Sequence, residues 1–208
     1  MRRLHSLFLG GAARLPHFAS QLHTHLVEPL GMQLRDLRSR CVRIACEVIT
    51  EGARCLGPLF RETALDLLPT LLRVLRATVA VISEAADGCI RKILQHVRAP
   101  PLLLPVLQGA VCKEAPAPSR CRCCQYVELL LRAEPPLVNQ DDLPQLEAAL
   151  AAALSDAAAD VRVAARDSLV AYDDFSPGRA TALRKKLRQQ APRAGGGAGG
   201  GGAGGGGA

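Results

Sequence analysis

The chain has no tryptophan among its 208 residues, only two tyrosines and four phenylalanines, and no apolar run long enough to span a membrane. Strands mainly use aromatic and β-branched residues, whereas the Leu and Ala that dominate this sequence are strong helix formers. A membrane helix needs about 20 apolar residues, and the apolar stretch 102–107 is short and interrupted by Pro105. The composition therefore predicts an all-α protein with no membrane partner.

Signals of catalysis are also scarce. No histidine lies in a nucleophile–base motif, and His23 and His25 are two apart, so they do not share a helix face for a metal. The glycines gather in residues 194–208, where they lack the strand–helix context of a phosphate-binding loop. We therefore expect no enzyme activity and no cofactor. The five histidines are His5, His17, His23, His25 and His96.

One stretch, SRCRCCQ at 119–125, first suggests a metal or redox site. Its cysteines, Cys121, Cys123 and Cys124, fall on different sides of a helix, and no CxxC pair or nearby downstream histidine completes a zinc set. We therefore expect no metal. Oxidation of an exposed Cys112 or Cys121 stays open, but only neighbouring arginines favour a lowered thiol pKa.

Charge and the two ends limit the partners. A net charge of +7 favours an acidic partner. A nucleic-acid binder would be expected to interleave aromatic and basic residues, which this chain does not do. The start, residues 1–13, weakly imitates a targeting peptide, but its apolar run is short and broken. Residues 191–208 are Gly/Ala-rich and are predicted to be a disordered tail outside the fold.

Residues 1–190 contain a repeat of about 40 residues. Four segments, VRIAC (42–46), ISEAA (82–86), SRCRC (119–123) and VRVAA (161–165), end in a small residue at spacings of 40, 37 and 42 residues. Breaks between helices are predicted near 15–16, 35–39, 57–58, 76–80, 99–101, 115–119, 134–136, 156–160 and 176–177. Asp36 and Ser39 in one break, and Asp156 and Asp160 in another, are predicted N-caps. Two helices per unit of this length predict an α-solenoid of HEAT or armadillo type, with Cys123 as a packing residue.

Specific strings resemble one family. The segments LRDLRSRCVRIACEVI (34–49) and SRCRCCQYVELLL (119–131), and the segments 67–107 and 154–183, are similar to successive repeats of the TOG domains of CLASP proteins. Residues 4–26 resemble the second helix of the first repeat and the helix after it. The resemblance implies a TOG/HEAT-repeat domain at 1–190 that begins inside an incomplete, N-terminally truncated first repeat. The first-repeat loop supplies a tubulin-contacting Trp in the family, and this chain has none.

TOG domains bind αβ-tubulin through the turn inside each repeat, along one edge. The resemblance therefore implies a monomeric, cytoplasmic protein on microtubules, the spindle among them, that binds tubulin and stabilises microtubules. The alternative is a generic HEAT-repeat scaffold without tubulin binding, whose cations would gather in the concave groove instead of at the turns. In a HEAT helix, Arg43 and Arg166 are expected to be structural, whereas Arg38, Lys113 and Arg120 are expected to bind. The contact residues implied are Arg35, Asp36, Arg38, Ser39, Arg76, Thr78, Val79, Lys113, Ser119, Arg120, Asp160 and Arg162.

Overall fold

The computed structural model describes residues 2–15 and 17–190, and in these ranges the regular structure is entirely helical. Short 3-10 segments at Ala12–Arg14, Gly57–Phe60, Pro100–Leu102 and Gln140–Asp142 precede four of the α-helices. The predicted all-α class is confirmed. The α-helices are α1 (Arg2–Leu9), α2 (Phe18–Leu34), α3 (Ser39–Leu56), α4 (Arg61–Val74), α5 (Ala80–Val97), α6 (Leu103–Val111), α7 (Ala117–Leu131), α8 (Leu143–Leu154), α9 (Ala159–Phe175) and α10 (Pro177–Gln190).

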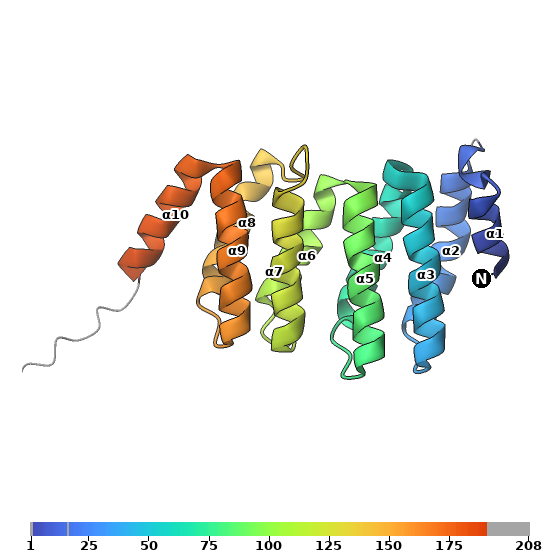
Figure 1. Ribbon diagram of the computed structural model, residues 1–208, viewed down its shortest axis with the longest axis horizontal. Coiled ribbons are helices and arrows are strands. Elements are labelled where there is room, and N and C mark those ends of the chain that lie inside the picture. The colour runs from blue at the N-terminus through green and yellow to red at the C-terminus, as the bar shows by residue number, and fades with distance from the viewer. Residues whose placement is uncertain (1, 16, 191–208) are drawn as a thin grey trace, which may run out of the picture.

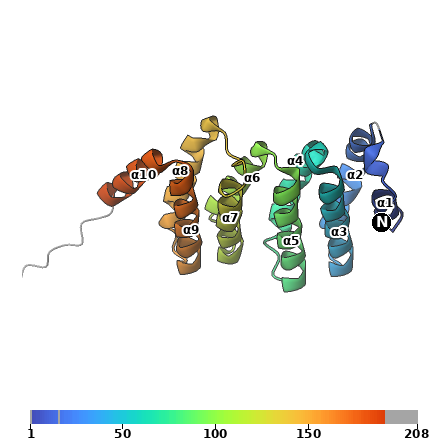
Figure 2. The ribbon, with the colours of Figure 1, turned by 45° about the horizontal axis from the view of Figure 1, so that its top comes forward.

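The helices form a right-to-left stack of antiparallel pairs, α2/α3, α4/α5, α6/α7 and α8/α9, with α1 before them and α10 after them (Figure 1). The second helices α3, α5, α7 and α9 make one layer, and the first helices make the layer behind it (Figures 1 and 2). A continuous row of Leu, Ile, Val, Ala and Cys side chains is buried between the layers. Each pair buries its apolar face against its neighbours, which is how a solenoid builds a core.

The small residues of the sequence repeat lie at the packing positions that the pattern predicts. Cys46, Ala86, Cys123 and Ala165 are all buried, on α3, α5, α7 and α9. Cys123 faces Gly109 of α6 so closely that a Cβ added to the glycine would lie 2.7 Å from its Sγ. The sulfur of Cys123 therefore fills the space between two helices, and the residues that the structure describes bring no three metal-ligating side chains together.

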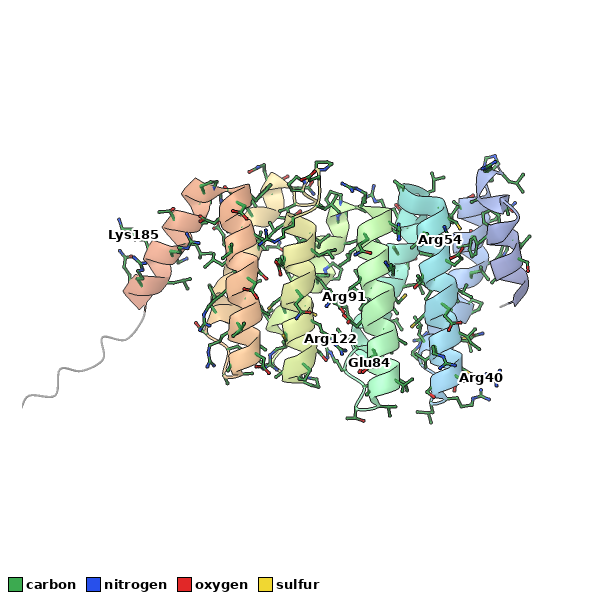
Figure 3. All side chains as sticks on the ribbon, viewed as in Figure 1. Arg40, Arg54, Glu84, Arg91, Arg122 and Lys185 are labelled. Atoms are coloured by element: carbon green, nitrogen blue, oxygen red, sulfur yellow. The ribbon has the colours of Figure 1, made fainter. Side chains whose placement is uncertain are left out.

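Polar side chains join the second and third repeats. Asp87 of α5 accepts hydrogen bonds from the Tyr126 hydroxyl at 2.5 Å and from Arg91 Nε at 3.1 Å. Arg91 also donates to Gln125 of α7 at 2.6 Å and lies over the Tyr126 ring at 5.3 Å. Figure 3 shows Arg91 and Arg122 between α5 and α7. Hydrogen bonds of this kind have narrow geometry, so they fix the angle between neighbouring repeats.

The predicted breaks between helices are close to the observed ones, but the N-caps differ. Asp36, Ser39, Asp156 and Asp160 were expected to cap α3 and α9, whereas the N-cap residues are Arg38 and Ala158. Asp36 and Asp156 each lie two residues earlier and accept the N-cap residue's backbone N–H at 2.8 Å. These hydrogen bonds therefore stabilise the turn before each helix, and the N-cap residue itself makes no side-chain hydrogen bond to the helix.

The N-terminal segment is part of the fold, whereas the C-terminal tail is not among the described residues. The segment weighed as a targeting peptide forms α1, with Phe8 buried and its ring 6.0 Å from that of Phe18. The predicted disordered tail at 191–208 lies outside the described residues. None of the described helices is both long and apolar enough to cross a membrane.

Candidate functional site

The turns inside the four repeats lie along one side of the stack, the lower edge in Figure 1, and we call this side the turn edge. The alignment follows from the fold, because every first helix ends and every second helix begins on the same side. Figure 3 shows Arg40, in the first turn of α3, at this edge. The turn edge consists of residues 35–38, 75–79, 112–116 and 155–158.

In the first turn, an exposed cation is held in place by its own turn. Arg38 donates to Asp36 from Nε at 3.0 Å and from Nη2 at 2.8 Å, while 77% of its side chain remains exposed. These hydrogen bonds lower the pKa of Asp36 well below its usual range and raise that of Arg38. Arg35 is exposed as well, but its Nε donates back to the carbonyl of Gly31 in α2 at 2.9 Å. Arg38 is therefore ordered yet accessible.

Exposed aliphatic side chains lie on the same edge. Leu37 in the first turn is 96% exposed, and Val79 in the second turn is 52% exposed. Val81, at the start of α5, is also exposed, so neither valine belongs to the core, a point that the sequence left open. Ser39 and Thr78 are exposed beside them. An exposed aliphatic side chain at a turn is available to a protein partner, since nothing in its own fold covers it.

The second and third turns are connected to each other. Arg76 is half-buried, and its Nη2 lies 3.3 Å from the Sγ of Cys112. Ser119 is buried, and its hydroxyl donates to the carbonyl of Leu75 at 3.1 Å. The hydroxyl of Ser119 therefore joins two repeats and does not reach the surface, whereas Lys113 in the third turn is exposed.

The third and fourth turns are joined by Arg120. Its Nε and Nη2 each lie 2.8 Å from one carboxylate oxygen of Asp156, and its Nη1 donates to the carbonyl of Ala115. Both side chains are only 13% exposed. The Arg120 hydrogen bond lowers the pKa of Asp156 and raises that of the guanidinium. With three of its five N–H donors bonded to the neighbouring turns, Arg120 holds the turns at a fixed spacing.

The fourth turn has a second internal arginine. Arg162 donates from Nη1 to the carbonyls of Asp156 and Ala157, each at 2.7 Å. Val161 beside it is buried, whereas Asp160 is exposed. A hollow of about 580 Å³ lies between the third and fourth turns, with Lys113 on its lining. The turn edge thus carries two groups of side chains: some face outward, and the arginines Arg120 and Arg162 hold the turns in place.

Sequence reasoning placed the expected residues on one edge but could not separate these two groups. The local sequence does not reveal that Arg120 is engaged within the fold, because its partner Asp156 lies 36 residues away. It also missed Arg40, an exposed cation one residue past Ser39. Its position directly after a predicted turn could have identified Arg40 as a contact residue.

The fold places the chain among TOG-type helical solenoids. It superposes on the MAST/Orbit N-terminal domain with a TM-score of 0.58 and 19% identity, over 79% of this chain and 78% of that one. A structure described as "Crescerin uses a TOG domain array to regulate microtubules in the primary cilium" matches with a TM-score of 0.63 and 18% identity, over 91% of this chain and 83% of that one. These two likenesses concern the fold.

The family follows from the sequence comparisons. The profile of the CLASP N-terminal family matches residues 2–194, so the chain belongs to this family. It is 34% identical over 167 residues to a CLIP-associated protein of Arabidopsis thaliana, and 26% identical over 166 residues to CLIP-associating protein 1-B of Xenopus laevis. Each match covers 80% of this chain but only 12% and 11% of those relatives. The chain thus spans about a tenth of their length.

Proposed function

We propose that the turn edge binds αβ-tubulin and that the chain acts without catalysis, as a monomer on cytoplasmic microtubules. One observation carries the proposal. In a chain of the CLASP N-terminal family, four turns lie along one edge and expose Leu37, Arg38, Val79 and Lys113. Aliphatic side chains between cations suit an acidic protein surface with apolar patches, because the cations steer the encounter and the apolar groups add affinity.

The residues that contact tubulin are proposed to be the outward-facing ones of the expected set. Arg38, Ser39, Thr78, Val79, Lys113 and Asp160 are exposed, as is Leu37, which the family resemblance also implies, and we add Arg40. We assign Asp36, Arg120 and Arg162 to fixing the turns, from the hydrogen bonds described above. Ser119 is left out because it is buried.

Microtubule stabilisation is proposed at the level of a longer protein. A single tubulin-binding module gains little residence on a lattice, whereas linked modules bind with an effective concentration set by their linker. The chain matches only about a tenth of its curated relatives, whose remaining length would supply other modules. We propose the cytoplasmic microtubules, the spindle among them, as the place of action.

Gel filtration of the purified chain with unpolymerised tubulin tests the proposal. We expect co-elution at micromolar concentrations and its loss in the double variant Leu37→Asp/Val79→Asp. Both side chains are exposed, so the variant should keep the helical spectrum of the parent chain. The matched control, Leu59→Asp/Val170→Asp, changes two exposed aliphatic residues away from the turn edge, one between α3 and α4 and one late in α9, and should still co-elute. A folded parent chain that never co-elutes with tubulin contradicts the proposal.

A further inference from the structure

The last helix differs from the others in its charge. α10 contains five basic residues and no acidic one. Cations near a helix C-terminus stabilise the helix dipole, but that effect falls off within the last turn and needs only one or two of them. The excess charge therefore lacks an explanation in helix stability. The five residues are Arg179, Arg184, Lys185, Lys186 and Arg188.

Two of these five cations are neutralised within the fold. Arg179 Nε lies 2.7 Å from Glu147 of α8, and Arg184 Nη1 lies 3.0 Å from Asp173 of α9. The other three are exposed and have no ion pair within 4.0 Å in the part of the chain that the structure describes. Figure 3 shows Lys185 pointing away from the stack. The three cations without an ion pair are Lys185, Lys186 and Arg188, of which Lys186 interacts electrostatically with Glu147 on the groove lining.

A groove lies on the side of α10 that carries Lys186, whereas Lys185 and Arg188 line a second hollow on another side of the helix. α10 tilts away from the stack in Figures 1 and 2, and a hollow of about 660 Å³ lies between it and α8. Ala148, Ala151, Leu183 and Leu187 supply its apolar lining, and Lys186 lies on it as well. This volume is within the range of sites that hold small ligands or a few side chains.

Residues 191–208, which follow α10, do not match the site. Residues 191–208 contain no acidic residue, and their single charged residue is Arg193. Beyond Arg193 every residue is Gly or Ala, too small to fill an apolar groove. Residues 191–208 therefore supply neither the complementary charge nor an apolar anchor.

We propose that α10 and the groove beside α8 bind an acidic polypeptide segment of a partner. The segment crosses α10, so that its carboxylates pair with Lys186 on one side and with Lys185 and Arg188 on the other, and one of its apolar side chains enters the groove. This surface is separate from the four turns. However, α10 runs in the same direction as the first helices of the repeats, so its cationic end points toward the turn edge. An acidic segment that flanks a structured partner could therefore reach both surfaces.

A polypeptide fits this surface better than other polyanions do. α10 has no aromatic residue on which nucleic-acid bases could stack. A membrane-surface helix needs a free apolar face, whereas Ala180 and Leu183 of α10 are buried in the fold. The groove thus has an apolar lining with Arg179, Lys186 and the paired Glu147 beside it, which suits a polypeptide segment with one apolar anchor.

Fluorescence anisotropy with two labelled peptides tests the proposal. One peptide consists of glutamates around a central leucine, and in the other each glutamate is replaced by glutamine. We expect the acidic peptide to bind and the neutral one not to bind. Lys185→Glu/Lys186→Glu/Arg188→Glu should weaken binding about tenfold or more. The matched control, Arg14→Glu/Lys92→Glu/Arg166→Glu, makes the same change in net charge at exposed positions elsewhere and should bind as the parent does.

Three further measurements distinguish specific binding in the groove from a nonspecific charge effect and from binding at the turn edge. Ala148→Phe on the exposed side of α8 should weaken the leucine-containing peptide but not a peptide of glutamates alone, since it fills only the groove. Equal losses in both triple variants would mean a nonspecific charge effect and would overturn the proposal, as would stronger binding to single-stranded DNA or to phosphatidylserine vesicles. Loss of tubulin binding in Leu37→Asp/Val79→Asp with peptide binding intact would show the two surfaces to be independent.

Discussion

Arg120 of α7 and Asp156, in the turn before α9, form a two-point ion pair with both N–O distances at 2.8 Å. The same carboxylate accepts the backbone N–H of Ala158, so one aspartate organises its own turn and holds the preceding repeat. The turn edge is therefore a set of turns whose spacing is fixed by side chains.

Removing Asp156 should destabilise the protein. Asp156→Ala leaves the guanidinium of Arg120 without its carboxylate in a site where little of it is exposed, and we expect a loss of about 2 kcal/mol in the free energy of unfolding. Urea unfolding followed by circular dichroism measures it. The control is Asp174→Ala, whose 3.4 Å pair with Arg132 is exposed and should contribute less than about 1 kcal/mol. Equal losses in the two variants would contradict the role given to Asp156.

The same ion pair predicts a dependence on pH. The hydrogen bond from Arg120 lowers the pKa of Asp156, so its stabilisation is fully present above the unfolded pKa of about 3.9. It is lost as the pH falls through the lowered, folded-state pKa, because protonation then favours the unfolded chain. Urea midpoints of the parent chain should fall between about pH 4 and pH 2 more steeply than those of Asp156→Asn. Parallel curves would be inconsistent with the pair.

Two glycines should respond oppositely to alanine. In Gly109→Ala the new Cβ would lie 2.7 Å from the sulfur of Cys123, and we expect a loss of about 1–3 kcal/mol from overpacking. Gly88 on α5 has nothing within 4 Å of a new Cβ, so Gly88→Ala should stabilise its helix by up to about 1 kcal/mol. Adding Cys123→Ala to Gly109→Ala should recover part of the loss. Additive losses in that double variant would show that the two residues do not compete for space.

The cysteines should differ in reactivity. Burial raises the pKa of both Cys123 and Cys124 to about 12, so at pH 8 their thiolate fractions are very small. Brief alkylation of the native protein, read by peptide mass spectrometry, should label the half-buried Cys41 and Cys112 first. Unfolding in urea should make all of them react, which is the control for intrinsic reactivity. Early labelling of Cys123 would contradict its packing against α6.

Arg38 and Arg120 should separate binding from stability. Arg38→Glu removes an exposed cation and should weaken tubulin binding severalfold while changing stability little, since its pair with Asp36 is exposed. Arg120→Glu places a carboxylate against Asp156, so its main effect should be a lower urea midpoint of unfolding. Co-elution with tubulin and urea unfolding, measured on both variants, test the distinction. An Arg38→Glu protein that binds tubulin normally would remove this residue from the contact set.

Much of the fold could be predicted from the sequence because its signals are local or periodic. Leu and Ala content predicted helices, Pro and Gly marked their ends, and a small residue recurring about every 40 positions predicted the stacked pairs. The predicted N-caps of α3 and α9 were wrong by one or two residues. An aspartate in a turn can accept the N–H of the residue two positions later, as Asp36 and Asp156 do, and the sequence does not show whether it does this or caps the helix.

The sequence by itself thus determined the helical solenoid, the family resemblance and the set of turns that share an edge. Only the tertiary structure decided which arginines face outward. Arg120 meets its partner 36 residues later in the next repeat, and Ser119 donates to a carbonyl 44 residues earlier. Stacking brings such pairs together across repeats, so whether a guanidinium is available to a partner depends on the neighbouring repeat and not on the residues beside it.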